Sequence, residues 1–134
     1  MQLLSCKSSV SNYEKIEPAH LEHLENSELS KLTLTEKAVE RIGILTATVE
    51  QESTDGYGAQ TPKTTVPYGA ILYDAHGHNW VYTNPEPNVF LRHEIKIDFI
   101  KDETVHLIEG PPVGTKVVTQ GAAELYGTEY EVGH

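Results

Sequence analysis

The stretch that decides the fold is Val89-Phe90-Leu91-Arg92-His93-Glu94-Ile95-Lys96-Ile97-Asp98-Phe99-Ile100. Successive side chains of a β-strand point to opposite faces of the sheet, so residues two apart share a face. One face would carry Phe90, Arg92, Glu94, Lys96 and Asp98. The other would carry Leu91, His93, Ile95, Ile97 and Phe99, and all of these except His93 are apolar. The pattern therefore predicts one long strand whose second face is directed at the core.

Shorter runs of the same kind lie on both sides of this stretch. Their glycine, proline, asparagine and aspartate boundaries are typical of strands joined by turns. The pattern predicts strands over residues 44–49, 66–73, 79–83, 104–108 and 116–119. Asp74-Ala75-His76-Gly77-His78 is expected to be a hairpin turn, and residues 84–88 are expected to break the ladder. Residues 121–127 are expected to form a terminal turn or a short helix.

The start of the structured chain carries the signals of one short helix. Residues 32–34 predict a short strand, and Thr35 can then cap a helix that runs to Ile42, with Gly43 as its left-handed stop. Together with the short strands, this single early helix predicts an all-β fold, mainly β with one short N-terminal helix. The expected architecture is a small β-barrel or β-roll.

The chain is expected to divide into a tether, residues 1–31, and a β-domain, residues 32–134. Residues 7–30 are polar, and a short helical turn near residues 18–25 is the one element expected there. Leu3-Leu4-Ser5-Cys6 looks like the end of a lipoprotein signal, which makes Cys6 a candidate lipid anchor. The alternative is an ordinary disordered N-terminus with a free thiol, since the apolar run before Cys6 is too short for a complete secretory signal.

The charge of the chain argues against one class of partner. The formal charge is −10, from 10 Lys and Arg against 20 Asp and Glu. Binding to nucleic acid or to anionic lipid headgroups requires basic side chains that neutralise phosphates. We therefore expect no nucleic-acid partner. No apolar run approaches the roughly 18 residues that a transmembrane helix needs.

Several short motifs occur in an order that is found in a known family. They are Val66-Pro67-Tyr68-Gly69-Ala70-Ile71-Leu72-Tyr73-Asp74-Ala75-His76-Gly77, Trp80-Val81-Tyr82, Phe90-Leu91-Arg92, the loop from Gly110 to Gly114, Val117-Val118, and the ending from Gly121 to Gly127. Leu34-Thr35-Glu36 and Ile42-Gly43-Ile44 precede them. This order resembles the membrane-proximal domain of periplasmic adaptor (membrane fusion) proteins of resistance-nodulation-division efflux systems, over residues 32 to 134.

In that family the membrane-proximal domain is assembled from both ends of a longer chain, with a lipoyl-like domain, an α-helical hairpin and a β-barrel domain between them. Here residues 50–64 alone bridge the two segments, and ends that lie close can be joined at small loop-closure cost. The resemblance implies a periplasmic, non-enzymatic domain, held at a bacterial membrane through lipidated Cys6, with a binding or assembly role in transmembrane transport. The implied partners are an inner-membrane efflux transporter, a full-length adaptor, or both.

Three aromatic residues are the candidates for a partner surface. Trp80, Tyr82 and Phe90 are the largest apolar side chains of the β region, and we expect them in the core. Any of them that remained exposed would mark a surface for a partner protein, because aromatic residues anchor protein interfaces.

The seven histidines raise an alternative function, a periplasmic protein that binds a divalent metal ion. His76 and His78 share the expected hairpin turn, and His20 and His23 have a spacing that places them on one helix face. No third ligand accompanies either pair, so solvated turn histidines are the simpler interpretation and we expect no cofactor. No nucleophile motif and no phosphate-binding loop has the required context, and we expect no enzymatic activity.

Overall fold

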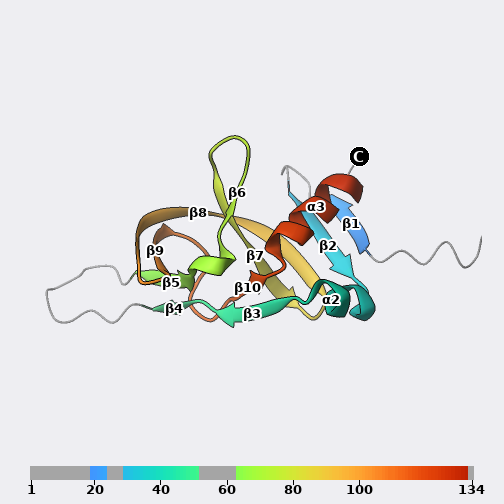
Figure 1. Ribbon diagram of the computed structural model, residues 1–134, viewed down its shortest axis with the longest axis horizontal. Helices are drawn as coiled ribbons and strands as arrows, with labels where there is room; N and C mark the ends of the chain where they lie inside the picture. Colours follow the sequence, from blue (N-terminus) through green and yellow to red (C-terminus); the bar gives the residue numbers. More distant parts are fainter. Residues whose placement is uncertain (1–18, 24–28, 52–62, 133–134) are drawn as a thin grey trace, which may run out of the picture.

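The computed structural model describes residues 19–23, 29–51 and 63–132, and strands dominate it (Figure 1). The strands are β1 (Ala19–His23), β2 (Ser30–Leu34), β3 (Leu45–Thr48), β4 (Glu50–Gln51), β5 (Thr64–Pro67), β6 (Leu72–Tyr73), β7 (Asn79–Glu86), β8 (Val89–Lys101), β9 (Thr104–Glu109) and β10 (Lys116–Gln120). The helices are α2 (Glu36–Ile42), α3 (Ala122–Val132) and the single 3-10 turn η1 (Tyr68–Ala70). None of the helices in these ranges is long and apolar enough to cross a membrane.

The sheet is nearly closed, because consecutive strands lie at its two ends. Its order is β3-β10-β7-β8-β9-β5-β4. Strands β3 and β4 are separated only by Val49, and they pair with β10 and β5 respectively. The Val49 side chain is fully buried, and its backbone N–H donates to the Thr115 carbonyl at 2.8 Å. The prediction of a mainly β, barrel-like domain is confirmed.

The hairpin of β1 and β2 lies beside this barrel. Its strands include residues that were predicted to belong to the tether, residues 1–31. Its strands are antiparallel, and Leu32 of β2 lies opposite Phe90 of β8. The helical turn expected near residues 18–25 is wrong for residues 19–23, because they form a strand whose Ala19 side chain packs into the core. Residues 30 and 31 likewise belong to the sheet. Residues 1–18, including Cys6, lie outside the described part of the chain.

The central strands bury both of their faces, which gives the domain two hydrophobic cores. The first core is formed by Ala19, Leu32, Leu34, Ala38, Leu72, Tyr82, Phe90, Val118, Ala122 and Leu125. The second core is formed by Val49, Val66, Ala70, Val81, Ile95, Val105, Leu107 and Val117. The sequence neighbours Val117 and Val118 enter different cores, because successive side chains leave a strand on opposite faces.

Strand β8 departs from the single apolar face expected of it. Ile95 is buried in the second core and Ile97 packs against it, as predicted. Phe90, which belongs to the other face, is also buried, because the first core lies on that side. The pairing of β8 with β9 shifts register between Ile97 and Phe99. A bulge of this kind changes the direction of the side chains that follow it. Phe99, which was predicted to face the core, is therefore 43% exposed.

Two other predicted element boundaries differ from those in the structure. Residues 66–73 do not form one strand, since β5 ends at Pro67 and η1 intervenes before β6. The expected break at residues 84–88 is shorter, because β7 runs to Glu86 across an irregularity in its pairing with β8. The Asn84 amide donates to the Glu86 and Val89 carbonyls at 2.7 Å each, which supplies side-chain hydrogen bonds where the ladder is irregular.

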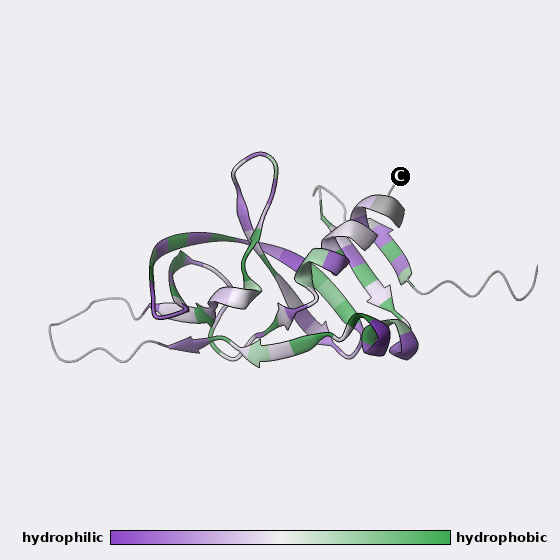
Figure 2. Cartoon of the chain, viewed as in Figure 1, coloured by the Kyte–Doolittle hydropathy of each residue, from purple (hydrophilic) through white to green (hydrophobic). Residues whose placement is uncertain are grey.

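Helix α2 agrees with its sequence signals. The Thr35 hydroxyl accepts the Ala38 N–H at 3.1 Å, and Gly43 adopts a φ of 79° at the C-terminal end. The charged outer residues of this helix are purple in Figure 2. Its one buried residue, Ala38, packs into the first core.

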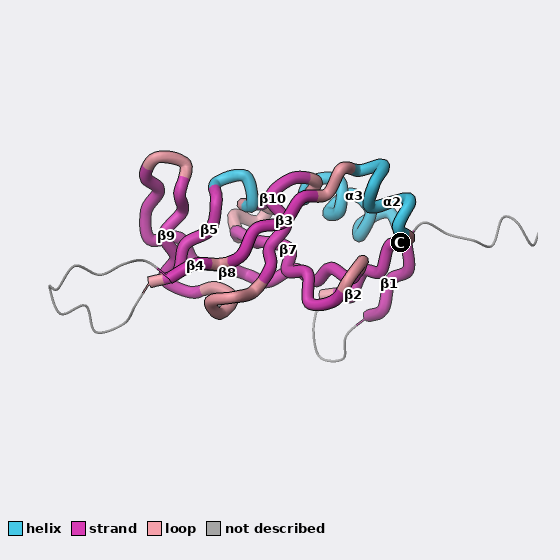
Figure 3. The backbone as a smooth tube through the Cα atoms, turned by 90° about the horizontal axis from the view of Figure 1, so that it is seen from below, coloured by secondary structure: helices cyan, strands magenta, loops and turns pink. Residues whose placement is uncertain are grey.

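Helix α3 is longer than the turn or short helix expected over residues 121–127. Gly127 is unfavourable in a helix interior, and the sequence pattern therefore stops there. In the structure the helix continues to Val132, and Glu129 is buried against the sheet. The described chain thus has a second α-helix besides the expected N-terminal one. Both helices lie at the same end of the molecule as β1 and β2 (Figure 3).

Candidate functional site

The hairpin turn between β6 and β7 is organised by one carboxylate. Asp74 Oδ1 accepts the backbone N–H groups of His76 and His78 at 2.8 Å each, and Asp74 Oδ2 accepts the Trp80 indole N–H at 2.9 Å. The Asp74 side chain is 7% exposed although the turn projects from the barrel (Figure 1). The hydrogen bond from Trp80, followed by those from the two backbone groups, lowers the pKa of Asp74 to about 2.

This pKa predicts how the hairpin responds to acid. The ordinary pKa of an aspartate is 3.8, so the folded state holds its proton less tightly than the unfolded chain. The stabilisation by Asp74 is therefore complete above pH 3.8 and is lost as the pH falls towards 2. We expect the NMR signal of the Trp80 indole N–H to shift with a midpoint near pH 2, and we expect no such step in Asp74→Asn. A midpoint near 3.8 would contradict the hydrogen-bond network.

A second polar cluster joins α3 to the sheet. Glu129 accepts from Arg92 Nε and a terminal guanidinium nitrogen at 2.9 Å each, and from the Tyr82 hydroxyl at 2.6 Å. The side chains of Arg92 and Glu129 are only 12% and 8% exposed. Two parallel hydrogen bonds between guanidinium and carboxylate fix geometry as well as charge. The guanidinium also lies 4.5 Å from the centre of the Trp80 ring and 5.3 Å from that of Tyr126.

The electrostatics of this cluster keep its hydroxyls protonated. Burial, and then the hydrogen bond to Glu129, raise the pKa of Tyr82 far above its usual range. Burial and the hydrogen bond to Tyr130 raise the pKa of Tyr126 to about 12. Burial works against the charge of Arg92, but the hydrogen bond and charge of Glu129 outweigh it and raise the pKa of Arg92. The cluster is thus a fixed ion pair with neutral phenols.

The aromatic partner-surface candidates are mostly interior. Tyr82 is fully buried and Phe90 is 2% exposed, so neither offers a surface to a partner in this conformation. Tyr82 and Phe90 are buried because the first core covers their face of the sheet. Trp80 is half-buried and packs against the first core, and the Arg92 guanidinium lies over its ring. Of the three, only Trp80 retains access to solvent.

The histidine candidates do not assemble into a complete metal site within the described residues. His76 and His78 are exposed on the hairpin turn, while His20 is exposed on β1, with His23 on the same strand. The nearest carboxylate, Asp74, already accepts three hydrogen bonds. No group of three or more His, Cys, Asp or Glu side chains able to hold a metal ion occurs in the ranges that the structure describes.

Metal binding stays a prediction that calorimetry can decide. If His76 and His78 bind a divalent ion, titration with Zn²⁺ or Cu²⁺ should release heat at a fixed stoichiometry. The heat should disappear in the double variant His76→Ala/His78→Ala, because imidazole nitrogens are the ligands. His93→Ala is the matched control, because His93 is exposed on β8 and belongs to neither candidate pair. Absence of heat in the unmodified chain would remove this alternative.

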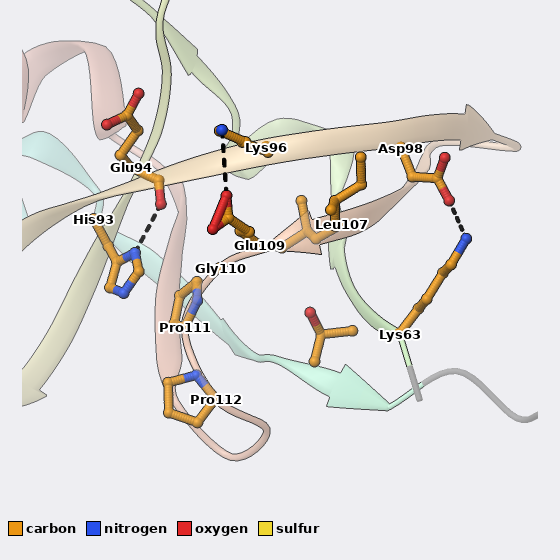
Figure 4. Close-up of a pocket in the computed structure, with 12 residues that line it drawn as sticks. Lys63, His93, Glu94, Lys96, Asp98, Leu107, Glu109, Gly110, Pro111 and Pro112 are labelled. Atoms are coloured by element: carbon orange, nitrogen blue, oxygen red, sulfur yellow. Dashed lines mark hydrogen bonds and ion pairs between the residues drawn. The ribbon is translucent and has the colours of Figure 1, made fainter. Parts of the chain in front are cut away.

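A broad groove of about 960 Å³ opens beside β8 and β9 (Figure 4). Its apolar lining includes Leu107, Ile108, Pro111 and Pro112, and Ile108 is 63% exposed. Two ion pairs border it: Lys96 lies 3.4 Å from Glu109, and Lys63 pairs with Asp98. Exposed pairs of this kind contribute little to stability, about 0–1 kcal/mol, so their charges are available for exchange with a partner.

The described residues form a small, nearly closed β-barrel that carries a side hairpin and two α-helices at one end. No protein-family model and no curated protein matches the chain. Among solved structures, the chain is similar to the NMR structure of a 180-residue part of SilB from Cupriavidus metallidurans CH34, which encompasses the N-terminal metal-binding site and the membrane proximal domain. The TM-score is 0.49 at 20% sequence identity, over 66% of this chain and 48% of that one. The chain thus spans about half the length of that structure.

Sequence reasoning missed the partnership of Arg92 and Glu129. The two residues are 37 positions apart, and Glu129 follows a glycine at which the expected helix ended. A usable signal was present in the alternation of β8, because Arg92 shares a face with the buried Phe90. A charged residue next to a core position on the same face requires a partner.

Proposed function

We propose that this chain is a non-catalytic adaptor-like domain that binds a component of a resistance-nodulation-division efflux system in the periplasm. Its partner would be the inner-membrane transporter or a full-length adaptor. Cys6 would hold the domain at the membrane through a lipid. The role of the domain is the assembly or modulation of the transport complex.

One observation carries the proposal: the segments that resemble the two ends of an adaptor pack into a single core. Leu34 and Ala38 from the upstream segment contact a cluster that contains Phe90, Val118 and Leu125 from the downstream one. Strand β2 also pairs directly with β8. This is the assembly from both chain ends that the resemblance implies for a membrane-proximal domain.

The groove supports a protein partner rather than a small anionic or cationic ligand. It combines Lys63 and Lys96 with Glu94, Asp98 and Glu109, so its charge is nearly balanced although the whole chain carries −10. Ile108, which lines the groove and is exposed, offers an apolar anchor. Protein interfaces commonly combine an apolar centre with a polar rim of this kind.

The test is site-specific crosslinking in native membranes. A photoreactive residue at position 108 should form a product with an efflux transporter or adaptor, identified by mass spectrometry. Ile108→Glu should lower recovery of that partner by about tenfold, because burial of one large apolar side chain contributes roughly 1.5 kcal/mol. Cys6→Ala should release the domain from the membrane fraction.

The matched control is position 45, since Leu45 is 56% exposed on β3 and does not line the groove. A photoreactive residue there should give no such product, and Leu45→Glu should leave recovery unchanged. Products that contain no efflux component from either position would refute the proposed function. Equal products from both positions would refute the groove as the contact surface.

A further inference from the structure

The two halves of α3 are held by different kinds of contact. In the first half, Ala122 and Leu125 are buried in the first core. Beyond Leu125, up to Tyr130, Glu129 is the one buried residue of the helix, and Tyr126 is partly buried against the first core. The first half is therefore fixed by buried apolar side chains, whereas the second half, up to Tyr130, is held by the Glu129 carboxylate and the partly buried Tyr126 ring.

The contacts of Glu129 are ones that water can replace. Its oxygens accept from the Arg92 guanidinium and the Tyr82 hydroxyl. If the carboxylate withdrew, water could solvate both donors, which is not true of an apolar surface such as that around Leu125. Opening the helix between Tyr126 and Tyr130 therefore exposes no fully buried apolar side chain, whereas opening the first half exposes Ala122 and Leu125.

The helix also has a weak point between its two halves. Gly127 lies between Leu125 and Glu129, and a Cβ built at Gly127 would meet nothing within 4 Å. No close packing explains a glycine there. Glycine in a helix interior favours the unfolded backbone by about 1 kcal/mol relative to alanine. Residues 126–130 thus combine low intrinsic helicity with one fully buried side chain, that of Glu129.

We propose that residues 126–132 form a strap, latched to the sheet by Glu129, that opens while the barrel and the first core stay folded. Local opening of a helix segment with few buried apolar contacts is a common form of sub-global unfolding. The closed strap places the ring of Tyr126 over Arg92, which in turn covers Trp80. The open strap uncovers Trp80, Tyr82 and Arg92, the residue types that dominate binding hot spots. This inference does not depend on the partner proposed above.

Hydrogen exchange of backbone amides in the full chain tests the latch. In Glu129→Gln the amides of residues 126–132 should exchange at least about tenfold faster, because each hydrogen bond to a charged group corresponds to roughly a factor of ten or more in an equilibrium constant. The amides of β7, β8 and β10 should keep their protection. Acrylamide quenching of Trp80, the one tryptophan of the chain, should rise in parallel.

Two further variants separate the latch from a general loss of stability. Glu124→Gln makes the same change on an exposed residue of the same helix and should alter neither measurement. The exchanged pair Arg92→Glu/Glu129→Arg should recover part of the protection that either single change removes. The inference is overturned if Glu129→Gln leaves residues 126–132 protected, or if strap and sheet amides lose protection by the same factor.

Discussion

Phe90→Ala is expected to destabilise the domain by about 3–5 kcal/mol, the usual range for removing a buried phenylalanine ring. Phe90 is 2% exposed and belongs to the core that joins β2, β8, β10 and both helices. The surrounding strands are hydrogen-bonded to one another and cannot collapse into the space that the ring leaves. Urea unfolding, followed by the fluorescence of Trp80, measures the loss as a lower midpoint.

Strand β8 supplies the control for this variant. Phe99→Ala removes the same ring, but Phe99 is 43% exposed and stacks on His106 at the outer surface. Its expected effect is about 1 kcal/mol or less, because an exposed side chain leaves no cavity. Equal losses for the two variants would show that the two ends of β8 do not differ in packing as the structure describes.

Gly121→Ala is expected to lower the free energy of unfolding by about 3 kcal/mol. Gly121 connects β10 to α3 with a φ of 101°, a conformation that side chains with a Cβ strongly disfavour. An added Cβ would also lie 3.0 Å from side-chain carbons of Ile42 and Ile44. Backbone strain of about 1–3 kcal/mol and overpacking of about 1 kcal/mol or more therefore act together. Thermal or urea unfolding of the variant measures the sum.

Gly114→Ala isolates the backbone part of that effect. Gly114 has a similar φ of 96°, but a Cβ there would meet nothing within 4 Å. Its loss of stability should be smaller than that of Gly121→Ala by the overpacking contribution, about 1 kcal/mol. If the two variants lose the same stability, the close approach of Ile42 and Ile44 to Gly121 does not contribute.

The sequence allowed the class of fold to be predicted because its signals are local. Thr35 and Gly43 cap α2 through contacts with residues close by in the chain, and the turn at Asp74 uses its own neighbours. The alternation of β8 placed Phe90 on the face away from the core, and only the size of its ring indicated burial, because the first core on that face is built by distant segments. The strand at Ala19 was missed for the same reason, since it pairs with β2 and its polar residues His20 and Glu22 are exposed.

The candidate site was less accessible to sequence reasoning. The hairpin turn was located, but the roles of its residues were not, because Asp74 rather than the histidines organises the turn. Trp80 and Tyr82 were singled out as aromatic residues, yet their importance lies in their contacts with Arg92 and Glu129. Those contacts join β7, β8 and α3, and no pattern within one segment encodes them.

The pairing of β4 with β5, which joins the two segments of the domain, determines where the chain can accept an insertion. Gln51 and Thr64 lie opposite each other in the pairing of β4 with β5, so the chain leaves the barrel and returns to it at neighbouring points. Genetic material inserted or deleted between these two points changes no strand order, and the entropy of closing a loop grows only slowly with its length. Whole domains can be gained or lost there while the barrel persists. Proteins that share this barrel can therefore differ by whole domains at this point and keep the same strand order.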